Sequence, residues 1–248
     1  MIVILTTLYN AEDYIGKCIK SIKKQKNTDY KCFILNDLST DMSADIVEEL
    51  IKDDDRFMLI NNSIKMYQPG NYNQIINGDY GLKDDDIIVE LDGDDWFPDE
   101  YVLDRIYEAY SDGETWITNG SFVYSNGQAG FSSRQQINNL RGVNFTASHL
   151  RTWKVFLWRK IKQEDLKDEN GEYWRVAGDL SFMFPMLEMS GDEHYKFLPD
   201  INYVYNEQNP LNDHKVNMDS VNEIVKKLRN KTPYVKYDKS VNPESIKK

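Results

Sequence analysis

Residues 87–96 read Ile-Ile-Val-Glu-Leu-Asp-Gly-Asp-Asp-Trp, a short apolar run followed by a cluster of carboxylates. Its apolar first half predicts a short buried strand. Asp92, Asp94 and Asp95 follow at once. Three crowded carboxylates repel one another and are costly to remove from water, so folding alone does not favour them there. A divalent cation such as Mg²⁺ or Mn²⁺ offsets that cost, because hard cations take oxygen ligands and often bridge to substrate phosphates.

The same turn has an interpretation that needs no metal. Asp95 or Asp99 then caps the next helix, and the turn is simply an acidic connection between a strand and a helix. Gly93 fits both interpretations, because glycine allows a tight turn and the close approach of another backbone. The other strand ends of the chain are needed to decide between the two.

The charge of the chain limits its partners. The 248 residues carry a net charge of −11. Residues 226–248 hold eight Lys or Arg against two acids, which leaves about −17 for the first 225 residues. A body this acidic excludes broad nucleic-acid binding through phosphate neutralisation. It is compatible with binding an anion through a metal.

The N-terminus and the cysteines bear on the compartment. No basic segment comes first, and the apolar run at residues 2–5 is too short for a signal peptide. No apolar run approaches the ~20 residues that span a membrane. Cys18 and Cys32 fall at apolar positions and are expected to be reduced core residues. We therefore expect a cytoplasmic protein.

The first half of the chain alternates apolar runs with helical patterns. Strands are expected at 2–5, 32–35, 57–60 and 87–91, and helices at 11–25, 40–51 and 72–80. This alternation predicts βαβ units and a parallel sheet. Ligands bind at the carboxyl ends of the strands in such sheets. Three of these ends carry polar clusters, at 6–10, 36–41 and 92–95, so we expect the site at their common edge.

The second half is less regular. Helices are expected at about 99–110, after His149-Leu150-Arg151 through about residue 161, from Gly178-Asp179 onward and at 219–229. Pro185 is expected to kink or interrupt the third of these. Strands are expected at 115–124 and 203–205, and long polar loops at 125–145 and 206–215.

Taken together, the polar clusters resemble those of the family 2 glycosyltransferases, which are inverting and use nucleotide sugars. The matching segments are Thr6–Asn10, Asn36–Asp41 and Leu91–Asp95 in the first 125 residues, with Gly178-Asp179 as the main match in the second half. The family usually has Asp where this chain has Asn36. That difference removes one charge and leaves Asp37 in place.

The resemblance implies an α/β fold of the GT-A type. Its Rossmann-like, mostly parallel central sheet is flanked by helices, with a smaller acceptor-side second half. Residues 1–125 would form the half that binds the nucleotide sugar. Residues 126–217 would form the acceptor-binding and catalytic half of the same domain. Residues 218–248 would be a C-terminal helix and a mobile basic tail, or a tail in weak contact with an anionic membrane surface.

The resemblance also implies donor-site roles. Thr7, Tyr9 and Asp37 would hold the nucleotide base, with Tyr9 against the base face and Asp37 accepting from a uracil imide N–H. The alternatives are a core tyrosine and a capping aspartate. Asp92, Gly93 and Asp94 would contact the nucleotide sugar, and Asp94 would ligate Mn²⁺ or Mg²⁺. Asp95 would ligate, accept from the donor sugar or cap a helix.

The remaining roles concern the metal and the acceptor. Asp179 would be the general base that takes the acceptor proton, or else a plain helix cap. His214 would ligate the metal or diphosphate, or else be solvated. His149 and Arg151 would line the acceptor pocket, clamp a phosphate or cap a helix. Trp96 is a candidate platform for sugar stacking.

The function implied is metal-dependent transfer of a sugar, with inversion, from a UDP-sugar to a glycan, lipid-linked, protein or modified-nucleobase acceptor. Nucleotidyl transfer is the first alternative, but it needs a cation near the first strand and residues 6–10 contain none. There is also no glycine-rich phosphate loop. A non-catalytic nucleotide-sugar binding module is the second alternative, against which Asp92, Asp94 and Asp179 argue.

Overall fold

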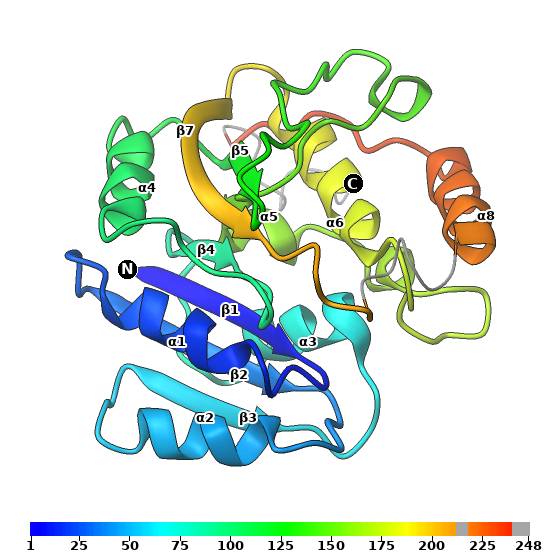
Figure 1. The fold of residues 1–248 in the computed structure, drawn as a ribbon. Helices are drawn as coiled ribbons and strands as arrows, with labels where there is room; N and C mark the ends of the chain where they lie inside the picture. Colours follow the sequence, from blue (N-terminus) through cyan, green and yellow to red (C-terminus); the bar gives the residue numbers. More distant parts are fainter. Residues whose placement is uncertain (212–217, 240–248) are drawn as a thin grey trace.

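A computed structural model describes residues 1–211 and 218–239 of the chain (Figure 1). One seven-stranded sheet runs through both halves in the order β3-β2-β1-β4-β6-β5-β7. Helices cover both of its faces (Figure 1). The expected α/β fold, with a central sheet flanked by helices, is confirmed.

The first half follows the predicted βαβ pattern. Its elements are β1 (Ile2–Leu8), α1 (Ile15–Lys23), β2 (Tyr30–Asn36), α2 (Ser43–Ile51), β3 (Phe57–Asn61), α3 (Tyr67–Ile76) and β4 (Ile87–Glu90). β1 pairs in parallel with both β2 and β4, and β2 pairs in parallel with β3. The third helix begins and ends about four residues earlier than predicted, because its first turn follows directly on contacts that Asp37 makes with residues 66 and 67.

The second half completes the sheet. Its elements are α4 (Val102–Tyr110), β5 (Ile117–Tyr124), β6 (Thr152–Lys154), α5 (Val155–Arg159), α6 (Gly178–Ser190), β7 (Tyr195–Tyr205) and α8 (Met218–Asn230), with 3₁₀ turns at Leu140–Gly142 and Gln163–Leu166. β5 and β7 run parallel, while β6 lies antiparallel between β4 and β5. Residues 125–145 form the expected long loop, which is interrupted by the 3₁₀ turn at Leu140–Gly142.

The helix predicted after Arg151, through about residue 161, is wrong at its start. Residues 152–154 form the strand β6, and α5 covers only Val155–Arg159. Trp153 lies opposite Ile88 of β4 and Ile117 of β5, and its side chain is fully buried. Pairing on both sides outweighs the local helical pattern, because intrinsic propensity is weaker than tertiary packing.

Two further predictions need correction. β7 has eleven residues rather than three, and it includes Pro199. It is the last strand of the sheet, where a residue without an N–H leaves no ladder bond unmade, and its exposed middle hides the apolar pattern. Pro185 lies inside α6 without ending it. Almost every residue of α6 is buried, so packing holds the helix together across the proline.

A hydrophobic cluster packs on each face of the sheet. One contains Val3 and Leu5 of β1 and Trp153 of β6, with residues from α3, α5 and α6, including Trp158. The other contains Ile2 and Ile4 of β1 with residues from α1 and α4. Alternate residues of one strand thus serve both clusters, as expected for a sheet covered on both sides.

The C-terminal segment returns to α6 (Figure 1). Tyr234 donates from its hydroxyl to Asp165 and from its backbone N–H to Glu188, and the N–H of Tyr237 donates to the carbonyl of Met189. Residues 240–248 lie outside the described residues, so the mobility of that part stays a prediction. Nowhere in ranges 1–211 and 218–239 is there a helix with the length and hydropathy needed to cross a membrane.

Candidate active site

The carboxyl ends of β1, β2 and β4 meet at one edge of the sheet, as predicted. The backbone N–H of Gly93 donates to the carbonyl of Thr7 at 2.9 Å, and the Thr7 hydroxyl donates to Asp92 at 3.2 Å. The N–H of Asp37 donates to the carbonyl of Leu8 at 2.8 Å. A Cβ on Gly93 would lie 2.8 Å from the Thr7 carbonyl oxygen, so only glycine fits this approach.

Asp37 is buried and organises the loop before α3. Its carboxylate accepts hydrogen bonds from the backbone N–H groups of Met66 at 2.8 Å and Tyr67 at 2.9 Å. The ammonium of Lys65 lies 3.6 Å from the same carboxylate and 3.1 Å from the centre of the Tyr9 ring. The structure therefore brings Tyr9 and Asp37 together through Lys65, a residue for which the sequence offered no signal.

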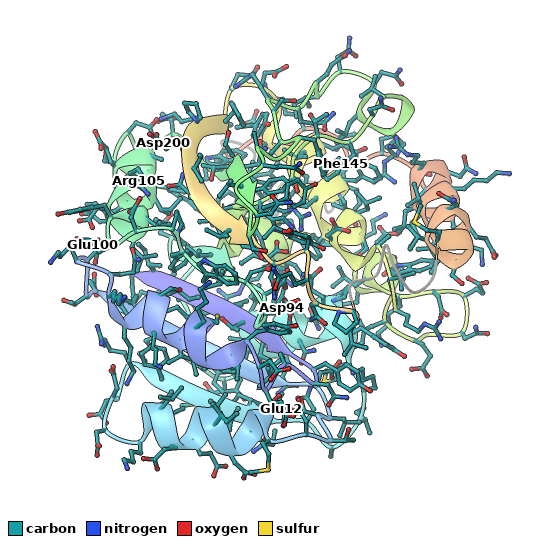
Figure 2. The ribbon with its side chains drawn as sticks, viewed as in Figure 1. Glu12, Asp94, Glu100, Arg105, Phe145 and Asp200 are labelled. Carbon is teal, nitrogen blue, oxygen red and sulfur yellow. The ribbon has the colours of Figure 1, made fainter. Side chains whose placement is uncertain are left out.

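Residues 203–209 of the second half donate hydrogen bonds to the acidic turn at 92–95. The phenol of Tyr203 donates to Asp95 and, at 3.3 Å, to Asp92. The backbone N–H of Asn206 donates to the other oxygen of Asp95 at 2.7 Å. The side chain of Asn209 donates to Asp94 at 2.7 Å. Figure 2 shows the labelled Asp94 between the two halves of the molecule.

These contacts bear on the roles left open for the turn. Both oxygens of Asp95 accept from β7 and the loop after it, so Asp95 does not cap the next helix; Asp99 instead accepts from the N–H of Tyr101 at 2.8 Å. Trp96 pairs its backbone with Val204, and the ammonium of Lys17 lies 3.2 Å from the centre of its ring.

Burial and mutual repulsion make negative charge costly in this turn. Burial first, and then the charge of Asp94, raise the pKa of Asp92. Burial, Asp94 and Asp92 raise the pKa of Asp95 well above its ordinary range. Burial and the neighbouring carboxylates also raise the pKa of Tyr203, which keeps its hydroxyl proton for donation. A bound cation would relieve this cost.

Arg151 links the predicted base to a second buried carboxylate. One nitrogen of its guanidinium lies 2.8 Å from Glu90, and another lies 2.7 Å from Asp179. The side chains of Arg151 and Glu90 are 6% and 0% exposed, while Asp179, the second residue of α6, is 25% exposed. Burial disfavours the guanidinium charge, but the charges of Glu90, Asp179 and Asp92 raise the pKa of Arg151 above its ordinary value.

His149 completes a group that fits a cation. One ligand atom from each of Glu90, Asp92 and His149 lies within 4.8 Å of the others. The Glu90 Oε2 and His149 Nδ1 atoms are buried and have no hydrogen-bond partner among the described residues. Burial and then the charge of Arg151 lower the pKa of His149, so its imidazole stays neutral and able to ligate. Carboxylate oxygens suit Mn²⁺ or Mg²⁺, whereas the imidazole favours ions such as Zn²⁺ or Fe²⁺.

His149, Arg151 and His214 had alternative predicted roles, which the structure limits only in part. His149 and Arg151 do not cap a helix, because β6 separates them from α5. His149 is buried, with its ring stacked on that of Tyr203 at 4.4 Å between centroids. His214 lies outside the described residues. Glu90 was missed, although a lone carboxylate inside an apolar strand was the available signal.

Known proteins resemble this chain in sequence. Residues 3–173 match the family model described as Glycosyl transferase family 2. The putative glycosyltransferase EpsH of Bacillus subtilis (strain 168) is 24% identical over 221 residues, which are 88% of this chain and 61% of that protein. The poly(ribitol-phosphate) beta-glucosyltransferase of Bacillus spizizenii is 29% identical over 131 residues, 50% of this chain and 19% of that protein. The chain thus spans less than two thirds of either relative.

Solved structures resemble it in fold. Residues 1–349 of S. aureus TarS in complex with UDP-GlcNAc share the fold with a TM-score of 0.67 and 17% identity, over 84% of this chain and 59% of that one. The mannosyltransferase PcManGT from Pyrobaculum calidifontis, in complex with GDP-Man and Mn²⁺, gives a TM-score of 0.57 and 12% identity, over 94% of this chain and 65% of that one. These likenesses confirm the GT-A type of architecture expected from the sequence.

Proposed function

Because the chain belongs to glycosyl transferase family 2, we propose that it moves a sugar from a UDP-sugar to an acceptor hydroxyl with inversion, with the help of a divalent cation. The observation that carries this proposal is that carboxylates from both halves of the chain lie near the end of β4. Asp92 and Asp94 follow β4. Asp179, in the first turn of α6, is linked to β4 through Arg151 and Glu90.

On the donor side, we assign Thr7, Tyr9 and Asp37 to the nucleotide base, and Asp92 to the sugar nucleotide. A UDP-sugar is favoured because the TarS structure contains UDP-GlcNAc. Asp94 would hold Mn²⁺ or Mg²⁺ together with His214, or the ion would sit among Glu90, Asp92 and His149. When bound, the cation supplies Lewis-acid stabilisation of the departing diphosphate.

The chemistry of the chain's own residues begins at Asp179. Its carboxylate would take the proton of the acceptor hydroxyl as that oxygen attacks the anomeric carbon. The new glycosidic bond forms while the bond to the diphosphate oxygen breaks, so the configuration at that carbon inverts. Asp179 is partly exposed, which leaves room for an acceptor beside it.

For the acceptor, we propose a glycan or a polyol-phosphate chain. The support is the name of one relative, a poly(ribitol-phosphate) beta-glucosyltransferase. Lipid-linked, protein and modified-nucleobase acceptors are further arms of the same test. We place the reaction in the cytoplasm, because both cysteines are free and buried, as expected in a reducing compartment.

A thermal-shift screen tests this proposal. UDP-, GDP- and TDP-sugars are added with and without Mn²⁺, and a UDP-sugar is expected to raise the melting temperature only when Mn²⁺ is present, because ligands that bind the folded state stabilise it. UDP release is then measured with each acceptor class. A protein that gives no metal-dependent shift with any nucleotide sugar contradicts the proposal. Release of pyrophosphate from UTP would favour nucleotidyl transfer instead.

A further inference from the structure

Arg151 occupies an unusual position between two carboxylates from different elements. Glu90 ends β4, Asp179 lies in the first turn of α6, and Arg151 comes just before β6. The guanidinium bridges them with contacts of 2.8 Å and 2.7 Å. The backbone N–H of Glu90 also donates to the carbonyl of Arg151 at 3.1 Å, so the two residues are held together by main chain as well as side chain.

Burying this guanidinium is costly, and stability alone does not explain it. Replacing a buried ion pair with apolar side chains is often neutral or stabilising. Asp179, in contrast, is partly exposed at the predicted acceptor side, where a short side chain would otherwise choose among rotamers. A planar guanidinium with fixed donors is suited to hold a carboxylate in one orientation.

We propose that Arg151 is a positioning residue that orients the carboxylate of Asp179 for proton removal, with Glu90 as its buried anchor. The inference rests on the proposed function, because it takes Asp179 as the base. One terminal nitrogen of the guanidinium donates to Glu90, which restricts rotation of the side chain. The other terminal nitrogen donates to Asp179.

The anchor also reaches the donor side. The side-chain amide of Gln68 donates to Glu90 at 3.0 Å and lies 3.5 Å from an oxygen of Asp92. Glu90 therefore accepts from Gln68 and Arg151 on the same oxygen. Through these contacts, the carboxylate that faces the donor and the carboxylate that faces the acceptor are placed relative to each other by one polar chain.

The test compares Arg151→Met, Arg151→Lys and Asp179→Asn with wild type, using UDP-sugar and Mn²⁺ in the transfer assay. We expect Arg151→Met to lower kcat about 100-fold, because a misplaced catalytic group costs this much. KM for the UDP-sugar should stay within about two-fold, since Arg151 itself is not assigned to the donor. Arg151→Lys should recover about ten-fold of the lost kcat, because an ammonium reaches Asp179 without the planar fork.

Arg141→Met is the matched control. Arg141 forms a slightly more exposed pair with Glu188, with contacts of 2.6 Å and 2.8 Å and exposures of 10% and 8%, between α6 and the turn at Leu140–Gly142. Its loss reports what removal of a buried ion pair does away from the site. We expect a lower melting temperature with kcat close to wild type.

A second variant covers failure to fold. Arg151→Met with Glu90→Gln removes both buried charges, so no unpaired carboxylate remains inside. Full kcat in either Arg151 variant, with Asp179→Asn inactive, overturns this inference but leaves the proposed function standing. Full kcat in Asp179→Asn overturns the base assignment itself. A low kcat with unchanged KM in the folded variants, restored in part by lysine, supports the inference.

Discussion

The phenol of Tyr203 donates a hydrogen bond to the carboxylate of Asp95, although the two residues are 108 positions apart. Tyr203 is fully buried on β7, and Asp95 belongs to the acidic turn after β4. The two strands are not neighbours in the sheet, since β6 and β5 lie between them. The contact therefore ties the far edge strand to the turn that is proposed to hold the donor.

Tyr203→Phe tests how much this contact stabilises the fold. Removing the hydroxyl leaves a buried carboxylate oxygen unsatisfied, so we expect the free energy of unfolding to fall by about 1–3 kcal/mol. Chemical unfolding in EDTA measures it. Tyr30→Phe is the control, because the buried Tyr30 hydroxyl donates only to the neutral carbonyl of Ile22. A loss no larger than in that control would contradict the prediction.

Asp94→Asn tests the metal. The variant keeps the shape of the side chain but loses its charge, so Mn²⁺ should no longer strengthen the binding of UDP. In wild type, UDP at about 100 times its Kd with Mn²⁺ should add about 2.7 kcal/mol of stability. EDTA should remove that gain, and Asp94→Asn should lack it. Asp84→Asn serves as control, because Asp84 is an exposed carboxylate paired with Arg159. Retention of the Mn²⁺ effect in Asp94→Asn would place the ion elsewhere, with Glu90, Asp92 and His149 as the next candidates.

Asp179→Asn separates binding from chemistry. The amide cannot take the acceptor proton, so we expect kcat to fall at least about 100-fold, the usual contribution of a general base. The thermal shift produced by UDP-sugar and Mn²⁺ should remain, because the proposed donor site lies at the ends of β1, β2 and β4. Asp112→Asn is the control, since Asp112 pairs with Lys196 on the surface. Loss of the donor shift along with activity would show a wider disturbance.

His149 predicts a pH dependence of stability. Burial and Arg151 lower the pKa of His149 well below 6.5, whereas the unfolded chain titrates near 6.5. Between these values the unfolded state binds more protons, so stability is present above pH 6.5 and falls as the pH drops. As the pH falls from 7.5 to 5.5 in EDTA, this residue should therefore lower the free energy of unfolding.

His149→Phe is the comparison for that measurement, because phenylalanine keeps the stacking on Tyr203 and does not titrate. Burial raises the pKa values of Glu90 and Asp92, which changes stability in the opposite direction in both proteins. The informative quantity is therefore the difference between the two pH profiles. Parallel profiles would mean that His149 is protonated in the folded state.

The sequence predicted the strands of the first half of the chain well. Hydrophobic period and strand length are local properties, so the strands around Ile4, Ile34 and Val89 could be read directly. Because parallel strands end at a common edge, the positions of Thr7, Asp37 and Asp92 followed from the order of the elements.

The second half of the chain was harder to predict for a physical reason. β6 has only three residues, and its place between β4 and β5 depends on partners far away in the chain. The local pattern around Trp153 carries no information about those partners, and it predicted a helix. The exposed middle of β7 likewise concealed a strand that packing and pairing stabilise.

The sequence by itself determined that carboxylates gather at the ends of parallel strands, because alternation of strands and helices sets the direction of each strand. Only the tertiary structure decided which groups these carboxylates face. Arg151 meets Glu90 and Asp179 across 61 and 28 residues, and Tyr203 meets Asp95 across 108. Such pairings depend on side-chain direction and on the exclusion of water, and both are set only once the chain has folded.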